Sequence, residues 1–286
     1  MTATDVFEAE RPRLTRLAYR MLSSVAEAED AVQDAWLRWS GADQANLENA
    51  RAWLVRVTTR LCLDRLKSAR ARRETYVGPW LPEPLVEPIA EDPVERAEEV
   101  SVAFLLALQR LSPLERAVFL LHDVFDQDFA AVATALQRSE PSCRQLASRA
   151  RRHVRDARPR FPVSQEEGLR LAGAFIQAAA NNDFAALAEM LTDDAVMITD
   201  GGGQRKAALR PMVGRDDVMA LVRGLAWRQN AWPPQSQVRL ARVNGYPGVI
   251  IDGPDGLITI AFEPGGGDKI AAIYVVRNPD KLSRVR

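Results

Sequence analysis

Two short amphipathic helices separated by a tight break, within residues 129–155, constrain this chain more than any other feature. Apolar residues at i, i+3, i+4 and i+7 predict one buried face on each helix. These residues are Phe129, Val132, Ala133 and Leu136 in the first helix, and Cys143, Leu146, Ala147 and Ala150 in the second. Two helices joined by so short a turn can pack only at a steep angle, so the segment predicts a helix-turn-helix.

The outer face of the second helix carries the polar and cationic groups that suit base edges and phosphates. We predict that DNA contacts come from Ser142, Arg144, Gln145, Arg149 and Arg152. Residues 138–160 hold eight arginines, and the whole chain has a net charge of zero, so the excess is local. The alternative is a solvated basic face in a protein that does not bind DNA. The turn holds Gln137 instead of glycine, and a left-handed residue there would cost about 1 kcal/mol relative to glycine.

Composition bounds the remaining possibilities. A chain of 286 residues is long enough for two or three domains, and 47% hydrophobic residues suffice for a real core. The two cysteines, Cys62 and Cys143, lie on apolar helical faces and predict neither a disulfide framework nor a metal site. The sequence shows neither a signal peptide nor an apolar run of 18 residues, so we expect a cytoplasmic protein without a membrane segment. We assign no cofactor and no metal.

Proline-rich stretches and changes in hydrophobic periodicity divide the chain into three predicted domains and a linker. Residues 1–73 form a helical domain, residues 74–99 form a Pro-rich linker, and residues 100–158 form the domain with the helix pair. Residues 165–286 predict an α+β domain with an antiparallel sheet. Its expected helices are 166–180, 184–191 and 216–226, and its expected strands are 195–199, 237–243, 248–251, 257–262 and 270–276.

The first helical domain has two oppositely charged faces. One helix shows an acidic outer face, which either is solvated surface or docks on a partner; its residues are Glu29, Asp30, Gln33 and Asp34. The next helix, within residues 51–73, is strongly basic and suits phosphate neutralisation. From it we predict DNA contacts by Arg51, Arg56, Arg60, Lys67 and Arg70. Trp53 fits the core better than a stacking platform for bases.

These segments, in this order, resemble an extracytoplasmic-function (ECF) RNA polymerase sigma factor. Residues 29–38 resemble the region-2 helix that docks on core RNA polymerase, and residues 51–73 resemble the segments that melt and read the −10 element. Residues 111–116 open a module that resembles region 4, which reads the −35 element in the family. The resemblance therefore implies two all-α sigma-type domains.

Three further strings resemble the subgroup with a fused SnoaL-like (NTF2-like) domain. They include Trp80, Leu81 and Pro82 in the linker, Asp200, Gly201 and Gly202, and Asn278, Pro279 and Asp280 near the C-terminus. The second string departs from the family pattern, because Gln204 precedes the basic residues Arg205 and Lys206. The resemblance implies an α+β NTF2-like cone that regulates the sigma factor from within the same chain. We expect this domain to pack against the linker or the region-2-like helices, with Trp80 as the buried anchor.

The same fold hosts enzymes, so the C-terminal domain is also a candidate for catalysis. Both histidines, His122 and His153, lie outside that domain, and general acid–base catalysis near neutral pH most often uses histidine. Carboxylates could substitute if desolvated: Asp193, Asp194, Asp200, Asp216 and Asp217. We assign no catalytic residue. Whether the domain holds an unknown small ligand stays open, because fold alone does not decide function.

The sequence thus predicts an ECF sigma factor that binds core RNA polymerase and promoter DNA. Two other classes stay open: a helix-turn-helix regulator with a ligand-sensing domain, and a SnoaL-like enzyme carrying a DNA-binding module. Binding to core polymerase without DNA separates the first class from the second, and turnover of a small substrate would favour the third.

Overall fold

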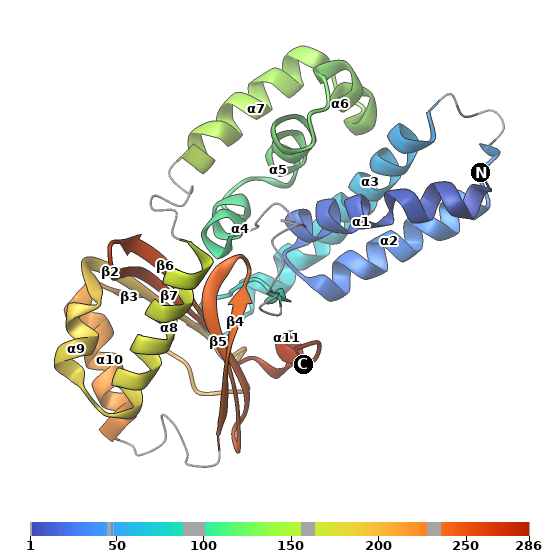
Figure 1. Cartoon of the computed structure of the whole chain (residues 1–286). Coiled ribbons are helices and arrows are strands. Elements are labelled where there is room, and N and C mark those ends of the chain that lie inside the picture. Colours follow the sequence, from blue (N-terminus) through green and yellow to red (C-terminus); the bar gives the residue numbers. More distant parts are fainter. Residues whose placement is uncertain are drawn as a thin grey trace. The chain divides into compact units, whose positions relative to one another are not determined.

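The protein divides into two compact units, and each is described by itself (Figure 1). A computed structural model describes residues 2–44, 47, 49–87, 101–155, 164–227 and 236–285, without the side chains of residues 69–74 and 165. The helical unit comprises Met1–Thr75 and Phe104–Arg158. The second unit comprises Tyr76–Ala103 and Pro159–Arg286, so the linker belongs with the C-terminal domain.

The helical unit begins with a three-helix module of α1 (Ala3–Leu22), α2 (Val25–Ser40) and α3 (Ala50–Glu74). Side-chain caps fix where α1 and α2 begin. The Thr2 and Ser24 hydroxyls accept hydrogen bonds from first-turn backbone amides that have no partner within the helix. The apolar stripe of α1 is buried: Leu14, Leu17 and Met21 are at most 1% exposed. In the part of the chain that the structure describes, no helix is long and apolar enough to cross a membrane.

The second helical module contains the predicted helix-turn-helix. Its elements are α4 (Val102–Gln109), α5 (Pro113–Phe119), the π-helix η2 (Leu120–Val124), α6 (Phe129–Leu136) and α7 (Glu140–Val154). Asp128 and Ser139 cap α6 and α7. The predicted apolar faces are buried except at Phe129, which is half-buried and has its ring centroid 3.8 Å from that of His122.

A buried arginine joins the two helical modules. Arg116 of α5 is 3% exposed, and its Nη1 donates to the carbonyl of Met21 at 2.5 Å. Its Nε donates to the carbonyl of Leu108 at 2.9 Å. Each carbonyl lies near a helix end, where backbone oxygens lack partners within the helix. Arg116 thus supplies hydrogen-bond donors to carbonyls at the ends of both α1 and α4.

The turn between α6 and α7 adopts the conformation that the sequence predicts to be unfavourable. Gln137 has φ 54° and ψ 51°, in the left-handed region where a side chain is strained. We expect Gln137→Gly to stabilise the helical unit by about 0.5–1 kcal/mol, measured as an increase in the free energy of unfolding in urea. Thr134→Gly, inside α6, is the control and should destabilise. A Gln137→Gly variant that is less stable than the parent would contradict the assignment.

The C-terminal domain is α+β, as predicted. Its helices are α8 (Gln165–Ala180), α9 (Phe184–Glu189), α10 (Arg215–Trp227) and α11 (Pro279–Leu282). Its strands are β2 (Leu191–Asp200), β3 (Met212–Val213), β4 (Gln237–Val243), β5 (Tyr246–Gly253), β6 (Gly256–Gly266) and β7 (Lys269–Val276). With β1 (Val86–Glu87) from the linker, the sheet order is β1-β4-β5-β6-β7-β2-β3.

Two features of the sheet differ from the prediction. The sheet is mixed, because β2 and β7 pair in parallel and only the other pairs are antiparallel. The linker also is not free of structure: Val86 and Glu87 form an edge strand on β4, opposite Val243 and Arg242. Prolines on both sides hid this short strand from the sequence pattern.

The two faces of the sheet have different neighbours. Figure 1 shows α8, α9 and α10 together at one side of the sheet and α11 at the other. The core between helices and sheet contains Phe175, Leu187, Val218, Phe262 and Ile273. Successive side chains of a strand point to opposite faces, so Val275 faces these helices while Val276 and its partner Asp200 face the other way.

Candidate functional sites

The outer face of α7 is exposed as predicted. Arg144, Gln145, Arg149 and Arg152 are exposed, and Ser142 is half-buried. Arg144 is held in place, because its Nη2 lies 3.2 Å from the Glu140 carboxylate and its guanidinium lies 4.5 Å from the centroid of the Phe129 ring. Arg149 lies 3.3 Å from Glu115. A basic recognition helix with oriented guanidinium groups is able to contact bases and phosphates.

The acidic residues of α2 lie on one outer face. Glu29, Asp30 and Gln33 are exposed, and Asp34 is half-buried. Arg65 of α3 contacts this face: its Nη2 lies 2.7 Å from Asp34, and its Nη1 lies 3.8 Å from Asp30. The acidic and basic helices are therefore linked by an ion pair. Leu37, one turn further along α2, is 60% exposed, so the face combines carboxylates with an apolar side chain.

The basic residues of α3 have different surroundings. Arg51 is exposed and lies 3.4 Å from Glu10, and Lys67 is exposed and lies 2.9 Å from Asp64. Arg56 is half-buried, and the side chain of Arg70 lies outside the described part of the helix. Arg60 donates to the carbonyl of Ala135 in α6 at 3.3 Å, so this predicted DNA contact is engaged within the helical unit.

Trp53 is half-buried and packs against a core tryptophan. Its ring centroid lies 5.5 Å from that of Trp39, which is 2% exposed. Trp39 in turn donates its indole N–H to the carbonyl of Ala3 at 2.8 Å. The aromatic pair therefore holds the start of α3 against α1 and α2.

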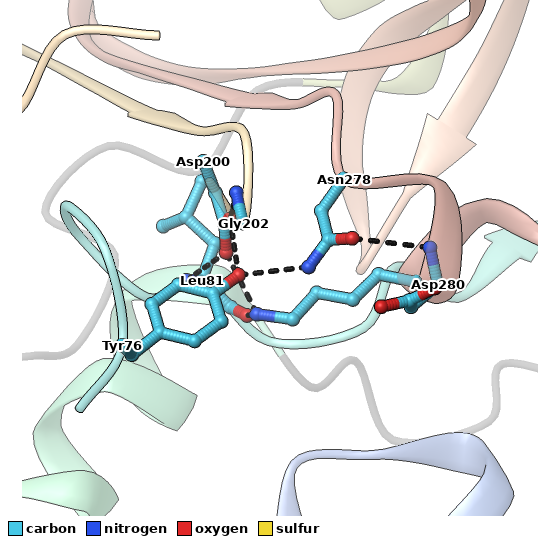
Figure 2. Close-up of polar contacts among 7 residues, drawn as sticks. Tyr76, Leu81, Asp200, Gly202, Asn278 and Asp280 are labelled. Atoms are coloured by element: carbon cyan, nitrogen blue, oxygen red, sulfur yellow. Dashed lines mark hydrogen bonds and ion pairs between the residues drawn. The ribbon is translucent and has the colours of Figure 1, made fainter. Parts of the chain in front are cut away.

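A buried carboxylate holds the linker to the C-terminal domain (Figure 2). Asp200, at the end of β2, is fully buried and accepts hydrogen bonds from two linker groups. The Tyr76 hydroxyl donates to Oδ1 at 2.5 Å, and the backbone amide of Leu81 donates to Oδ2 at 2.8 Å. Burial and the bond to Asp200 raise the pKa of Tyr76, so the phenol keeps its proton and remains a donor.

The C-terminal string completes this arrangement. Lys281 is 9% exposed, and its Nζ lies 2.7 Å from Asp200 Oδ2 and donates to the Leu81 carbonyl at 2.6 Å. The Asn278 amide donates to the Tyr76 hydroxyl at 2.8 Å. We name Tyr76, Leu81, Asp200, Asn278 and Lys281 the linker latch. A buried charge pair of this kind is stable only because hydrogen bonds satisfy both partners.

The glycines after Asp200 serve close packing and not phosphate binding. A Cβ on Gly202 would lie 2.3 Å from the amide nitrogen of Asn278, and one on Gly201 would lie 2.1 Å from the Arg205 carbonyl. Gly202 also has φ +61°. Gln204, which departs from the family string, donates to Asp280 at 2.7 Å, so it bridges the second and third strings.

Sequence reasoning missed two members of the latch and misjudged a third residue. Tyr76 and Lys281 were not named as site residues; the signal for Lys281 is that the chain has only four lysines against 34 arginines. Trp80, expected to be the buried anchor, is half-buried, with Lys281 Nζ 3.8 Å from its ring centroid. The buried anchor is instead Leu81, at 1% exposure, followed by the buried residues Pro82, Glu83 and Pro84.

Three of the five carboxylates that are candidates for catalysis pair with cations, and the other two, Asp194 and Asp216, are exposed. Asp200 belongs to the latch, Asp217 lies 2.7 Å from Arg210, and Asp193 lies 2.5 Å from Arg215. Both cysteines are buried, and desolvation raises the pKa of Cys62 to about 12 and that of Cys143 in the same direction. Thiols in this state are poor nucleophiles.

The helix-turn-helix with its exposed basic helix, joined to a second charged helical module, defines a DNA-binding protein of the sigma type. Residues 6–72 match the family Sigma-70 region 2, and residues 101–154 match Sigma-70, region 4. The chain belongs to the ECF RNA polymerase sigma factors.

Two similar proteins and one solved structure support this assignment. The chain is 39% identical to ECF RNA polymerase sigma factor SigJ of Mycobacterium tuberculosis, over 97% of this chain and 92% of the relative. It is 33% identical to the probable ECF sigma factor SigI of the same species, over 98% and 94%. The crystal structure of M. tuberculosis SigJ matches with a TM-score of 0.78 and 36% identity, over 98% of both chains.

Proposed function

We propose that this sigma factor binds core RNA polymerase through the acidic face of α2 and reads promoter DNA through α3 and α7. The observation that carries the proposal is the exposure of two complementary surfaces on family-matched modules: carboxylates on α2 and guanidinium groups on α7. A protein that only bound DNA would have no use for the acidic face. The protein acts in the cytoplasm, where the polymerase works, as a regulator of transcription and not as an enzyme.

The test is run-off transcription with purified core polymerase and the full-length protein on a promoter library selected for binding. Transcripts that start at a fixed distance from a bound sequence, and only when the protein is present, support the proposal. Binding to DNA with no transcripts, and no binding to core polymerase, would instead assign the chain to helix-turn-helix regulators.

The acidic face gives the first functional prediction. We expect Glu29→Lys with Asp30→Lys to weaken binding to core polymerase at least about tenfold, because each substitution places a cation where the proposed partner meets an anion. Asp34 is left intact so that its 2.7 Å ion pair with Arg65 is preserved, and only the longer 3.8 Å contact of Arg65 with Asp30 is lost. The control is Glu8→Lys on α1, an exposed acid outside the face. Equal titration curves for parent and variant would exclude this face as the docking surface.

The recognition helix α7 gives the second functional prediction. We expect Arg144→Ala to cost about 1–3 kcal/mol of binding to the cognate site, because Arg144 lies in the first turns of α7, where base contacts concentrate. Arg155, at the end of the helix, is the comparison, and Arg155→Ala should weaken binding to all sequences about equally. If Arg144→Ala lowers affinity for cognate and random DNA by the same factor, Arg144 does not read sequence.

We further propose that the linker latch regulates the sigma factor. The latch fixes residues 76–87 to the C-terminal domain, and these residues connect directly to α3. The same residues must extend if the two helical modules are to reach separated promoter elements. An intrachain contact that opposes extension biases an equilibrium between held and released linker.

A further inference from the structure

The C-terminal domain contains a pocket between its helices and the sheet face that points away from the latch. Its volume is about 130 Å³, close to the roughly 150 Å³ of an apolar cavity that accommodates benzene. The walls are mainly apolar, with Phe175 and Phe184 from the helices and Ile251, Ile260 and Val275 from the strands. Such walls suit an aromatic ring or a short aliphatic chain.

Three polar side chains interrupt the apolar wall: Arg277, Ser236 and the exposed Asp255. Arg277 Nε and Ser236 Oγ are buried without a hydrogen-bond partner among the residues that the structure describes. A buried donor without a partner costs about 1–3 kcal/mol, so each atom favours a ligand that satisfies it. The other end of the guanidinium is fixed, because Arg277 Nη1 donates to the Lys206 carbonyl at 2.7 Å.

The charges around Arg277 favour an anion. Burial lowers the pKa of Arg277, which marks a charged group held away from water. Asp255 and Arg205 are the neighbouring charges, and their effects on Arg277 have opposite signs. Neither charge satisfies Arg277 Nε, which has no hydrogen-bond partner among the described residues. A carboxylate that accepts from Nε would satisfy the donor and neutralise the charge.

We propose that this pocket binds a small apolar carboxylate, either an aromatic acid or a medium-chain aliphatic acid. The apolar body fills the space beside Phe175, Phe184 and Val275, and the carboxylate accepts from Arg277 Nε. Ser236 precedes β4, and Arg277 follows β7, three strands away in the sheet order, so one carboxylate does not meet both. Ser236 Oγ is therefore not part of the carboxylate site.

The pocket adjoins the linker latch through the backbone, and this step rests on the regulatory function proposed above. Arg277 is followed directly by Asn278, whose side chain bonds Tyr76 on the other face of the sheet. The backbone amide of Arg277 also donates to the carbonyl of Asp200 at 2.7 Å. A ligand that pulls on Arg277 therefore acts within one residue of the latch, and occupancy of the pocket changes how firmly the linker is held.

Binding is tested by calorimetric titration of the full-length protein with phenylacetate and octanoate, and with their neutral primary amides as matched probes. At least one acid should bind about tenfold or more tightly than its amide. Arg277→Gln should remove that preference while leaving the amide affinity unchanged, which also shows that the variant is folded. Arg205→Gln removes an exposed charge of the same neighbourhood and should preserve the preference. Ala179→Phe, which fills the pocket, should abolish binding of both probes.

Equal affinities of acid and amide, an acid preference that survives Arg277→Gln, or no binding of any probe at 5 mM would each overturn the proposal. Failure of the regulatory function is distinguished by run-off transcription. Binding that depends on Arg277 without an effect of the acid on transcription would retain the site and remove its regulatory role.

Discussion

Asp200→Ala is expected to lower the free energy of unfolding of the C-terminal unit by about 3–5 kcal/mol, the largest effect we predict for one substitution. The change leaves the buried Lys281 ammonium without its carboxylate, and it leaves Tyr76 and the Leu81 amide without their acceptor. Urea denaturation monitored by tryptophan fluorescence measures the loss. Limited proteolysis should show new cleavage within residues 76–87, because these residues lose their attachment.

A second variant separates the loss of charge pairing from the loss of packing. Asp200→Leu combined with Lys281→Met removes both charges, and replacing a whole buried pair with apolar residues is often neutral. We therefore expect this double variant to recover most of the stability that Asp200→Ala loses. If both variants are equally unstable, the ion pair is not what holds this part of the domain together.

Tyr76→Phe combined with Asn278→Ala is expected to raise run-off transcription from a fixed promoter about tenfold. The pair of substitutions removes the hydrogen bonds of the Tyr76 hydroxyl to Asp200 and Asn278. Two hydrogen bonds contribute about 1–3 kcal/mol together, and 1.4 kcal/mol shifts a two-state equilibrium tenfold. The released linker should make the DNA-competent state more populated.

We expect an increase in transcription because the attached linker is too short for the promoter spacing. Elements at −10 and −35 lie about 25 base pairs apart, or roughly 85 Å along B-DNA at 3.4 Å per step. Residues 76–103 span at most roughly 100 Å when fully extended, and residues 88–103 alone at most roughly 55 Å. A linker that is held at residues 76–87 therefore limits the separation of the two helical modules, and release removes the limit.

Tyr274→Phe is the matched control. It also removes a tyrosine hydroxyl from a hydrogen bond to a carboxylate, that of Glu263 at 2.7 Å, but both residues lie in neighbouring strands of the sheet and not in the linker. Transcription should be unchanged in this variant. The affinity of the helix pair for its DNA element should be the same in all three proteins. Lower or equal transcription in the Tyr76→Phe, Asn278→Ala protein would contradict a restraining role for the latch.

Much of the fold follows from patterns within single segments. The helical stripes and the β-runs 237–243 and 270–276 are local signals, and the structure confirms these elements. In the first run, however, Val238 and Leu240 are 44% and 40% exposed. Pairing between segments is not local. The parallel pairing of β2 with β7 and the edge strand Val86–Glu87 depend on partners far along the chain, so no window of sequence contains them.

The candidate sites also divide into those that lie on a single helix and those that join residues far apart in the sequence. Exposed residues of α7 and α2 follow from helix periodicity, and the structure places them on the predicted faces. The latch joins positions 76, 200 and 281, and the pocket joins positions 236 and 277 to an apolar wall. The resemblance to a family pointed to the strings around three of these positions. Nothing in the sequence indicated that Arg277 and Asn278 face opposite sides of one sheet.

The position of Lys281 near the end of the chain sets an order of events during synthesis. Domains fold as the chain emerges, N-terminal parts first, at about 5–20 residues per second. Residues 76–87 are therefore made roughly 10–40 s before the lysine that completes their attachment to Asp200. The second helical module is complete once Val154 is made, roughly 6–25 s before Lys281, and for that time both modules are present with an unrestrained connection. Each newly made molecule thus passes through a brief state in which polymerase could capture it before its own C-terminal domain restrains it.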